Sequence, residues 1–449
     1  MKVLEVLEKS VAVFCIVSFG GSVLPALLTG GGTTDPDAPG AVVYFMAVYV
    51  MILALIAARP SLAFRLPMGS PAVSLIVALA FLSALWSIYP DVTLRRAVAF
   101  LFTTVFAVYL ALRYTFPEIV RLLAAGLSIL MVLSYVSVFA MPAVGLDSEQ
   151  HVGAWKGIFW QKNVTGRMMV WLVLCLLWLD WMHEGRRWVV RPLLLMALLL
   201  IVMSRSGTGL VTSILVAGLL LVSGFVRGGI RSFAPAMAFI LLVAVVGITS
   251  GTTFWHDILY MLGRDPTLTG RTVLWEHTLM SIQDRFLLGW GYGAYWYGAY
   301  GPGSTFTQGW GINSAHNGWM EAWLDLGLPG VILTAMLMGR LLIQGFMAVR
   351  YSVNRAEPAW IFTVGCALLL ISVSESVFLE RHSLNWIVMV VAVTRLVQRR
   401  RWAKMQARLQ DRRLEDRYAP QAAFASSSPY GTSYGAPPSA GWSGPARPG

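Results

Sequence analysis

Charged residues are scarce in this chain. Asp, Glu, Lys and Arg make up only 12% of its 449 residues, whereas 57% are hydrophobic. A soluble globular domain carries about a quarter charged residues, so this composition excludes a soluble protein. The apolar runs are continuous and about 20 residues long, as membrane-crossing helices require, and do not alternate in segments of about ten as barrel strands do. The expected fold class is an all-α integral membrane protein.

Cysteines and common catalytic signatures are also scarce. Cys15, Cys175 and Cys366 lie far apart inside apolar runs, so they indicate inert thiols and no disulfide framework. The sequence contains no HExxH, CxxC, Walker or GxSxG motif. Asp35 and Asp37 form a DxD-like pair that would suit a divalent ion, but such pairs are common in turns. We expect no metal and no cofactor.

About twelve stretches are apolar enough for membrane-spanning helices. They are 10–28, 41–58, 71–88, 97–112, 119–140, 168–182, 190–203, 209–226, 234–250, 319–345, 357–377 and 384–398. The first resembles a secretory signal, but it continues past Pro25 and many spans follow, so we interpret it as a retained helix. An even number of spans places both termini on one side. Lys and Arg collect in alternate loops, which predicts that this side is the cytoplasm.

This pattern divides the chain into four parts. Residues 1–250 carry the first nine spans, 251–318 form one large periplasmic loop, 319–400 carry the last three spans, and 401–449 form a cytoplasmic tail. The tail is basic up to Arg417 and then polar, so its end is expected to be disordered. Its basic run next to a last span is typical of binding to anionic membrane lipids; nucleic acid is the less favoured partner.

Several cations depart from the cytoplasmic pattern and are predicted to face outward. They are Arg95, Arg96, Lys156, Lys162, Arg167, Arg205, Arg264, Arg271, Arg285 and Arg381. Because exporting so many cations is unfavourable, they indicate an anionic ligand at the outer face. For Arg95 and Arg96, snorkelling to lipid headgroups explains the positions equally well.

Two of these arginines stand where a helix is expected to begin. Arg205 lies in a tight connection before Gly207-Thr208-Gly209, whose backbone amides and helix dipole favour a phosphate. Arg271 follows Gly270 and precedes apolar residues at helical spacing, Trp275, Leu279, Ile282 and Phe286, which predict an amphipathic helix in the outer interface. A topological Arg205 and a solvated Arg271 are the alternatives.

His316 opens the polar start of the tenth span. Arginines near it would lower its pKa and leave a neutral imidazole that accepts a proton, although a lone histidine is often structural. Asn317, Glu321 and Asp325 follow at intervals of four and share a helix face. Glu321 would orient a substrate or pair with an arginine; a favourable charge at a helix N-terminus is the other reading.

Four segments resemble a known family. TGRTVLWEHTLMSIQDRFLLGWGYG followed by SAHNGWMEAWLDLGLPG, together with GIFWQKNVTGRM at 157–168 and SRSGTG at 204–209, resemble the O-antigen ligase and polysaccharide polymerase superfamily. LSALWSIYPDVTLRRA at 82–97 is similar to its exopolysaccharide polymerase branch. The resemblance spans roughly residues 70–390.

This resemblance implies an inverting glycosyltransferase of the bacterial inner membrane that needs no metal and has the C-type membrane glycosyltransferase fold. Its donor would be a glycan on undecaprenyl diphosphate, and its acceptor a glycan or lipid-glycan; other polysaccharide assembly proteins would be partners. By motif, Arg205 and Arg271 would hold the diphosphate and His316 would be the catalytic base. Lys162, Asn163, Arg167, Asn317, Glu321, Arg95 and Arg96 would bind substrate.

Three functions fit these observations. A polymerase joins repeat units, and we favour it because of the segments at 82–97 and 157–168. A ligase moves a finished glycan to lipid A core or another acceptor. A transporter of lipid-linked sugar needs no chemistry, but its site is usually near the bilayer midplane within repeated halves, which this sequence does not suggest. Tryptophans and tyrosines such as Trp296 and Tyr297 suit stacking on sugars or an interfacial belt.

Overall fold

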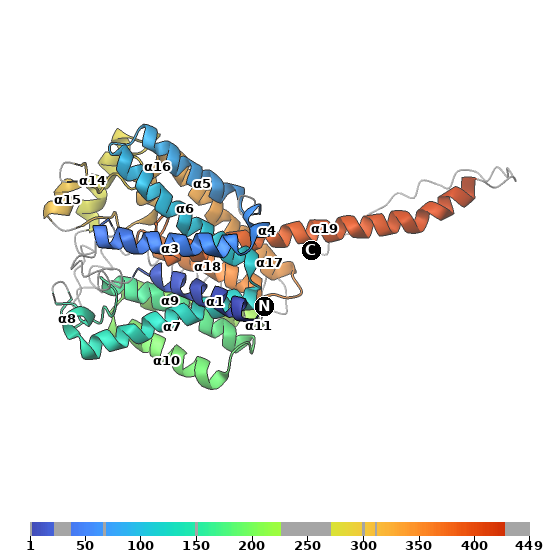
Figure 1. Ribbon diagram of the computed structural model, residues 1–449, viewed down its shortest axis with the longest axis horizontal. Helices are drawn as coiled ribbons and strands as arrows, with labels where there is room; N and C mark the ends of the chain where they lie inside the picture. Colours follow the sequence, from blue (N-terminus) through green and yellow to red (C-terminus); the bar gives the residue numbers. More distant parts are fainter. Residues whose placement is uncertain are drawn as a thin grey trace, which may run out of the picture. The chain divides into compact units, whose positions relative to one another are not determined.

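The computed structural model describes residues 2–21, 37–65, 69–148, 151–225, 271–298, 301–309 and 312–426. Within these ranges the regular structure is helical, apart from one isolated bridge between Leu146 and Trp155 (Figure 1). The predicted all-α class is confirmed for this part of the chain. The predicted span 234–250 and the first part of the predicted periplasmic loop, 251–270, lie outside the described residues.

The chain divides into two compact units, Met1–Val397 and Gln398–Gly449. The first unit is a bundle, and the second contains the distal part of the last helix. The helices are α1 (Lys2–Ser18), α3 (Pro39–Ala57), α4 (Pro60–Ala63), α5 (Pro71–Leu82), α6 (Pro90–Arg113), α7 (Phe116–Ala140), α8 (Pro142–Gly145), α9 (Lys162–Trp181), α10 (Arg187–Met203), α11 (Gly207–Phe225), α14 (Arg271–Asp284), α15 (Ser304–Gly309), α16 (Gly318–Gly339), α17 (Gly345–Tyr351), α18 (Ala356–Ser372) and α19 (Leu384–Ser426), with a 3₁₀ turn at Ser83–Leu85 and a π turn at Arg340–Gln344.

The sequence marks where several helices begin. Pro39, Pro71 and Pro90 each open a helix, where the missing N–H costs nothing and the fixed φ suits the first turn. Thr115 and Glu118 form a reciprocal capping box at the start of α7. These local signals fix the starts of helices whose apolar faces then pack together.

Five described helices are long and apolar enough to cross a membrane: Pro39–Ala57, Pro90–Arg113, Phe116–Ala140, Lys162–Trp181 and Gly318–Tyr351. Three shorter apolar helices, Pro71–Leu85, Gly207–Ser223 and Ala356–Ser372, accompany them. This arrangement is that of a multi-pass membrane protein. The total of twelve spans stays a prediction.

Several predicted boundaries are wrong. Helix α9 begins at Lys162 instead of 168. Its first turns are polar, so hydropathy assigns them to a loop, but they are helical because other parts of the protein surround them. Helix α18 ends at Ser372 instead of 377, which leaves residues 373–383 as a connecting segment. Helix α1 covers Lys2–Ser18 instead of 10–28. Helix α19 continues past Arg417 to Ser426, where disorder was expected.

Helix α9 lies at the centre of the bundle and contacts α7, α10, α11 and α18. Two buried indoles of α9 have paired N–H groups: Trp171 donates to Asn385 Oδ1 at 2.8 Å and Trp178 to the Ala356 carbonyl at 2.9 Å. A buried indole N–H needs such a partner, so these bonds fix how α9 meets the helices around it. The position of α9 in turn fixes the polar residues on its first turns.

Charged side chains gather at the two ends of α6. At its C-terminal end Arg113 and Arg59 both bind Glu8, at 2.9 and 3.0 Å. At its N-terminal end Arg96 pairs with Asp37. Arg96 and Arg113 are separated by about 26 Å along the helix, so the two clusters lie toward opposite faces of the hydrocarbon layer that α6 would span.

Helix α16 is interrupted at Gly327, whose φ of 63° and ψ of −159° are not helical. A Cβ atom there would lie 2.3 Å from the Leu287 carbonyl oxygen. The segment after α14 is bound to this break: Trp290 N–H donates to the Leu324 carbonyl at 2.7 Å and Leu328 N–H to the Phe286 carbonyl at 3.2 Å. Only glycine allows the two backbones to approach so closely.

Candidate functional site

A cavity of about 590 Å³ lies within the first unit. Residues from α1, α3, α6, α9, α16 and the segments 292–298, 313–316 and 375–385 line it. Its charged and imidazole side chains are Arg96, Arg167, His316, Glu321, Asp325, Glu375, Glu380, Arg381 and His382. Residues far apart in the sequence thus meet around one polar space.

Glu375, in the segment between α18 and α19, is the centre of the polar contacts. Its carboxylate oxygens lie 3.1 Å from Arg167 Nη1 and 3.3 Å from Arg271 Nη2, and Asn163 Nδ2 donates to it at 3.0 Å. His316 Nδ1 lies 3.7 Å from Glu375 Oε2. We call these five residues, Asn163, Arg167, Arg271, His316 and Glu375, the Glu375 cluster. Four of them were expected to act on substrate, and the structure brings those four together.

Glu375 itself was not singled out from the sequence, because it was assigned to the end of the span 357–377. Burial would raise the pKa of this carboxyl, but Arg167, His316 and Arg271 outweigh burial and lower its pKa to about 2. Glu375 is therefore ionised at neutral pH. Two arginines against one carboxylate leave the cluster with one excess positive charge.

The backbone around His316 is held tightly from both sides. The carbonyl of Ala315 accepts from Trp275 Nε1 at 2.9 Å, and the amide of Ala315 donates to Glu321 Oε2 at 2.8 Å. His316 itself has a φ of 49°, in the left-handed region that non-glycine residues rarely adopt. The ring of His316 turns Nδ1 toward Glu375, at a distance too long for a hydrogen bond. A carboxylate that the sequence did not indicate thus lies beside the ring.

Glu321 was expected to orient a substrate or to pair with an arginine. Its carboxylate instead accepts hydrogen bonds from Trp296 Nε1 at 2.8 Å, from the Ala315 amide at 2.8 Å and from Ser376 Oγ at 3.1 Å. Ala315 precedes His316 and Ser376 follows Glu375. Glu321 therefore joins the two segments that carry the imidazole and the carboxylate.

Asn317 caps α16. Its Oδ1 accepts from the amides of Trp319 and Met320 at 3.0 and 3.2 Å, and its Nδ2 donates to the Val373 carbonyl at 3.3 Å. These bonds satisfy the start of the helix and tie it to the segment 373–383. Contact of Asn317 with substrate stays a prediction.

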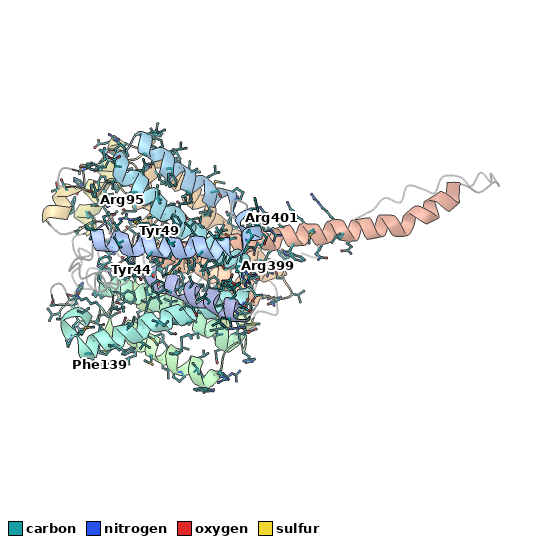
Figure 2. All side chains as sticks on the ribbon, viewed as in Figure 1. Tyr44, Tyr49, Arg95, Phe139, Arg399 and Arg401 are labelled. Carbon is teal, nitrogen blue, oxygen red and sulfur yellow. The ribbon has the colours of Figure 1, made fainter. Side chains whose placement is uncertain are left out.

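Arg95 and Arg96 contribute to a second cluster. Asp37 pairs with Arg96, with Arg381 at 3.1 Å and with Arg95 at 3.8 Å. Arg96 also donates to the Gly293 carbonyl. Figure 2 shows the half-exposed Arg95 near the start of α6. Asp37 is thus occupied by arginines, and its DxD neighbour, Asp35, lies outside the described residues.

A second histidine lines the cavity. His382 stacks on Phe45 with 3.5 Å between ring centroids, and its Nε2 lies 2.5 Å from the Tyr49 hydroxyl. Figure 2 shows Tyr49 on α3. Burial and the nearby Arg381 lower the pKa of His382 well below its ordinary value, so this ring is neutral. Nothing in its sequence context indicated this position.

The expected helix after Arg271 is present as α14, and Arg271 begins it. Of its predicted apolar residues, Ile282 is buried, whereas Leu279 and Phe286 are 48% and 43% exposed. Leu274, outside the predicted set, is also buried, and α14 contacts α16. A position of α14 in the outer interface stays a prediction.

Arg205 stands apart from both clusters. It has a φ of 52° in the exposed turn between α10 and α11, and its Nη1 lies 3.4 Å from the Val152 carbonyl. The turn nevertheless adjoins the site, because Thr208 Oγ1 lies 3.0 Å from Ser374 Oγ. Lys162 begins α9, one residue before Asn163. Neither Arg205 nor Lys162 lines the cavity.

The two arginines Arg205 and Arg167 should differ in their effect on stability. We expect Arg205→Ala to change the free energy of unfolding by less than about 0.5 kcal/mol, since its side chain is exposed. Arg167→Ala removes a buried partner of Glu375 and should cost about 3 to 5 kcal/mol. Thermal unfolding of the detergent-purified variants measures this difference. Equal losses would contradict the placement of Arg205 outside the cluster.

The fold and the site together define a multi-pass helical membrane protein with a charged cavity at one end of its bundle. Residues 192–335 match the model of a family described as O-antigen ligase. The chain is also 26% identical over 273 residues to the exopolysaccharide production protein ExoQ of Rhizobium meliloti (strain 1021). That match covers 58% of this chain and 61% of ExoQ, less than two thirds of the relative. The resemblance to the O-antigen ligase and polysaccharide polymerase superfamily is confirmed by these two matches.

Proposed function

We propose that this protein is a polysaccharide polymerase that transfers a glycan from undecaprenyl diphosphate to a sugar hydroxyl at the periplasmic face of the bacterial inner membrane. The observation that carries this proposal is the convergence of Arg167, Arg271 and His316 on Glu375. Arg167, His316 and Glu375 line the cavity, and Arg271 contacts Glu375 from outside its lining. The likeness to a protein named for exopolysaccharide production supports it.

The cations of the Glu375 cluster would receive the diphosphate. Arg167 and Arg271 carry two positive charges and Glu375 one negative charge, so an anion is favoured next to them. Guanidinium groups bind phosphate oxygens in a fixed fork geometry and stabilise the charge that develops on a leaving diphosphate. Arg205, on the adjoining turn, would reach the donor only from outside the cavity. Asn163 and Lys162, at the start of α9, would contact the second phosphate or the glycan.

His316 would activate the acceptor hydroxyl. Because Nδ1 faces Glu375, Nε2 is the nitrogen that can accept the hydroxyl proton, and the carboxylate stabilises the imidazolium that forms. The acceptor oxygen forms a bond to the anomeric carbon of the donor, while the bond from that carbon to the diphosphate oxygen breaks. The lipid diphosphate leaves with the electron pair. A single displacement of this kind inverts the anomeric configuration. The proposed step uses no metal ion.

The distribution of charge supports an outward-facing site. The arginines that sequence analysis assigned to the outer side, Arg95, Arg96, Arg167, Arg271 and Arg381, belong to the two clusters at the cavity. Arg59 and Arg113, which directly follow the second and fourth predicted spans and so lie on the predicted cytoplasmic side, bind Glu8 at the other end of α6. We therefore infer a periplasmic cavity and cytoplasmic termini. Trp296 and Tyr297, which line the cavity, would stack on the sugars.

A ligase that moves finished glycan to another acceptor is the second candidate, favoured by the description of the matched family. A transporter is less favoured. The imidazole of His316 and the carboxylate of Glu375 lie next to two arginines, and this arrangement suits glycosyl transfer better than transport of an intact substrate. Of the three residues to which the resemblance gives catalytic roles, Arg271 and His316 meet at Glu375 and Arg205 does not, and His316 alone of the three lines the cavity.

The experiment that separates these functions replaces the chromosomal copy by His316→Asn and analyses lipid-linked and surface glycan. Asparagine tolerates the left-handed backbone at this position, so only the base is lost. We expect long polymer to fall by about 10² to 10⁴-fold, the usual effect of a general base, while single repeat units accumulate on the carrier. His183→Asn, a left-handed histidine in the turn between α9 and α10, is the matched control.

Accumulation of long chains on the carrier would instead identify a ligase. Glycan of normal amount and length in the His316→Asn strain, with protein present in the membrane, would exclude both enzymatic proposals.

A further inference from the structure

A second, separate cavity of about 330 Å³ opens between α7 and α10. Leu176 and Leu179 of α9 form its floor, and Ala125 and Ser128 of α7 face Leu193 of α10 across it. The small side chains on α7 leave the space open. Further along the pair of helices, the Tyr135 hydroxyl donates to the Met196 carbonyl at 2.8 Å and holds them together. The result is an apolar groove, one end of which lies toward this hydrogen bond.

The other end of the groove is strongly basic. Arg121 and Arg186 line it, and Arg187 and Arg191 follow on the first turns of α10. In the described part of the chain, two carboxylates pair with these arginines: Glu184 with Arg121 at 2.6 Å, and Asp180 with Arg191 at 3.3 Å and Arg187 at 3.8 Å. The paired arginine side chains are exposed, and the two carboxylates are partly buried. Among the described residues, Arg186 makes no ion pair. Two positive charges at the mouth therefore remain uncompensated.

This groove is remote from the Glu375 cluster. Helix α9 carries Arg167 near its start and Leu179, on the groove floor, near its end. Twelve residues of helix correspond to about 18 Å, so the two sites lie at different levels of the bundle. A nearby tryptophan, Trp188, is 72% exposed, as is common for residues that anchor a helix at a membrane surface.

We propose that this groove is a binding site for an anionic phospholipid. One acyl chain would lie along the alanine and leucine side chains, and the phosphate would lie between Arg121 and Arg186. Charge complementarity favours this occupant over a zwitterionic lipid, because basic pockets between membrane helices select anionic headgroups. It also favours a lipid over a second copy of this chain, whose groove mouth carries the same excess of arginines.

The test uses the full chain, purified in detergent, with native mass spectrometry to measure bound lipid. Phosphatidylglycerol and phosphatidylcholine with identical acyl chains are added at equal mole fractions. We expect wild-type protein to bind phosphatidylglycerol at least about fivefold more tightly, since one arginine near an anionic headgroup contributes about that factor. Arg186→Gln should weaken phosphatidylglycerol binding about fivefold and leave phosphatidylcholine binding unchanged.

Two further variants sharpen the result. Ala125→Trp fills the groove and should abolish binding of both lipids at this site. Arg350→Gln, an exposed arginine on α17 away from the groove, is the charge-matched control and should bind as wild type does. Equal binding of the two lipids, or equal loss in Arg186→Gln and Arg350→Gln, would overturn the proposal. So would an oligomer that Ala125→Trp dissociates, or occupation by undecaprenyl phosphate that phosphatidylglycerol does not displace.

Discussion

Replacing Glu375 by glutamine should both destabilise the protein and abolish polymer formation. Glutamine keeps the shape of the side chain but removes the charge that Arg167 and Arg271 share. The carboxylate of Glu375 and the guanidinium of Arg167 are almost entirely buried, with 2% and 6% of their side chains exposed. Loss of one partner of a buried pair typically costs about 3 to 5 kcal/mol. Thermal unfolding in detergent and the length of surface glycan measure the two effects.

Glu380 provides a matched control in the same segment. It is buried as well, but its partners are neutral: Ser383 Oγ donates at 2.7 Å and Asn385 Nδ2 at 3.3 Å. Burial raises the pKa of Glu380, although Arg167 opposes this. Glutamine resembles the protonated acid, so Glu380→Gln should cost less than about 1 kcal/mol. If both substitutions had the same effect, the special role of Glu375 would be refuted.

The contribution of Glu375 should also depend on pH in a defined direction. Its pKa is lowered from an ordinary value of 4.5 to about 2, so the ionised form is bound more tightly in the folded protein. The stability that it adds is complete above about pH 4.5 and is lost as the pH falls toward 2. The difference in free energy of unfolding between wild type and Glu375→Gln should therefore shrink over this interval. A constant difference would mean that the charge does not matter.

Glu321→Ala should reduce polymer formation strongly while the protein remains in the membrane. The substitution leaves the Trp296 indole, the Ala315 amide and the Ser376 hydroxyl without their acceptor. Each unsatisfied buried donor costs about 1 to 3 kcal/mol. The greater effect is on geometry, because a displacement of about 1 Å between His316 and its substrate lowers a rate about 10²-fold.

The conservative variant distinguishes positioning from substrate binding. Glu321→Gln keeps one acceptor oxygen, so we expect intermediate stability and partial polymer length. Glu276→Ala removes an exposed carboxylate from α14 and should leave both properties unchanged. Glycan assays and unfolding curves on the same membrane preparations give both readouts. Full activity in Glu321→Ala would show that the segments carrying His316 and Glu375 hold their positions without it.

Much of the fold could be predicted from composition and local pattern. Apolar runs predicted most of the helices, and prolines and the Thr115 capping box explain where some of them start. The errors at Lys162 and Ser372 share one cause. Hydropathy is averaged over many residues, and this average does not show whether a polar side chain inside the bundle forms a hydrogen bond or an ion pair. Such partners come from distant parts of the chain.

The candidate site shows the same division. His316 and Asn163 could be predicted from motifs. Arg271 and Arg167 could be predicted from motifs and because they lie in loops assigned to the outer side, where Lys and Arg are usually rare. Glu375 could not, because it follows an apolar run and its hydrogen-bond partners Asn163, Arg167 and Arg271 lie 104 to 212 positions away in the sequence. Nor did any pattern indicate that Glu321 would bind Ala315 and Ser376 instead of an arginine. Its spacing from Asn317 predicts a shared helix face but not what that face contacts.

The interruption at Gly327 divides α16 into two helical portions. Glu321 and Asp325 lie before it and are bonded to the segments around the cavity, whereas the residues after Pro329 lie within the long apolar helix. A continuous helix would transmit any tilt or shift of its lipid-embedded portion to His316. Because the helix is interrupted at Gly327 and the segment after α14 holds the backbone on both sides of the break, we expect bilayers of different thickness to tilt the embedded portion and leave the spacing of His316 and Glu375 unchanged. Membrane composition and catalytic geometry would then be decoupled by a single residue without a side chain.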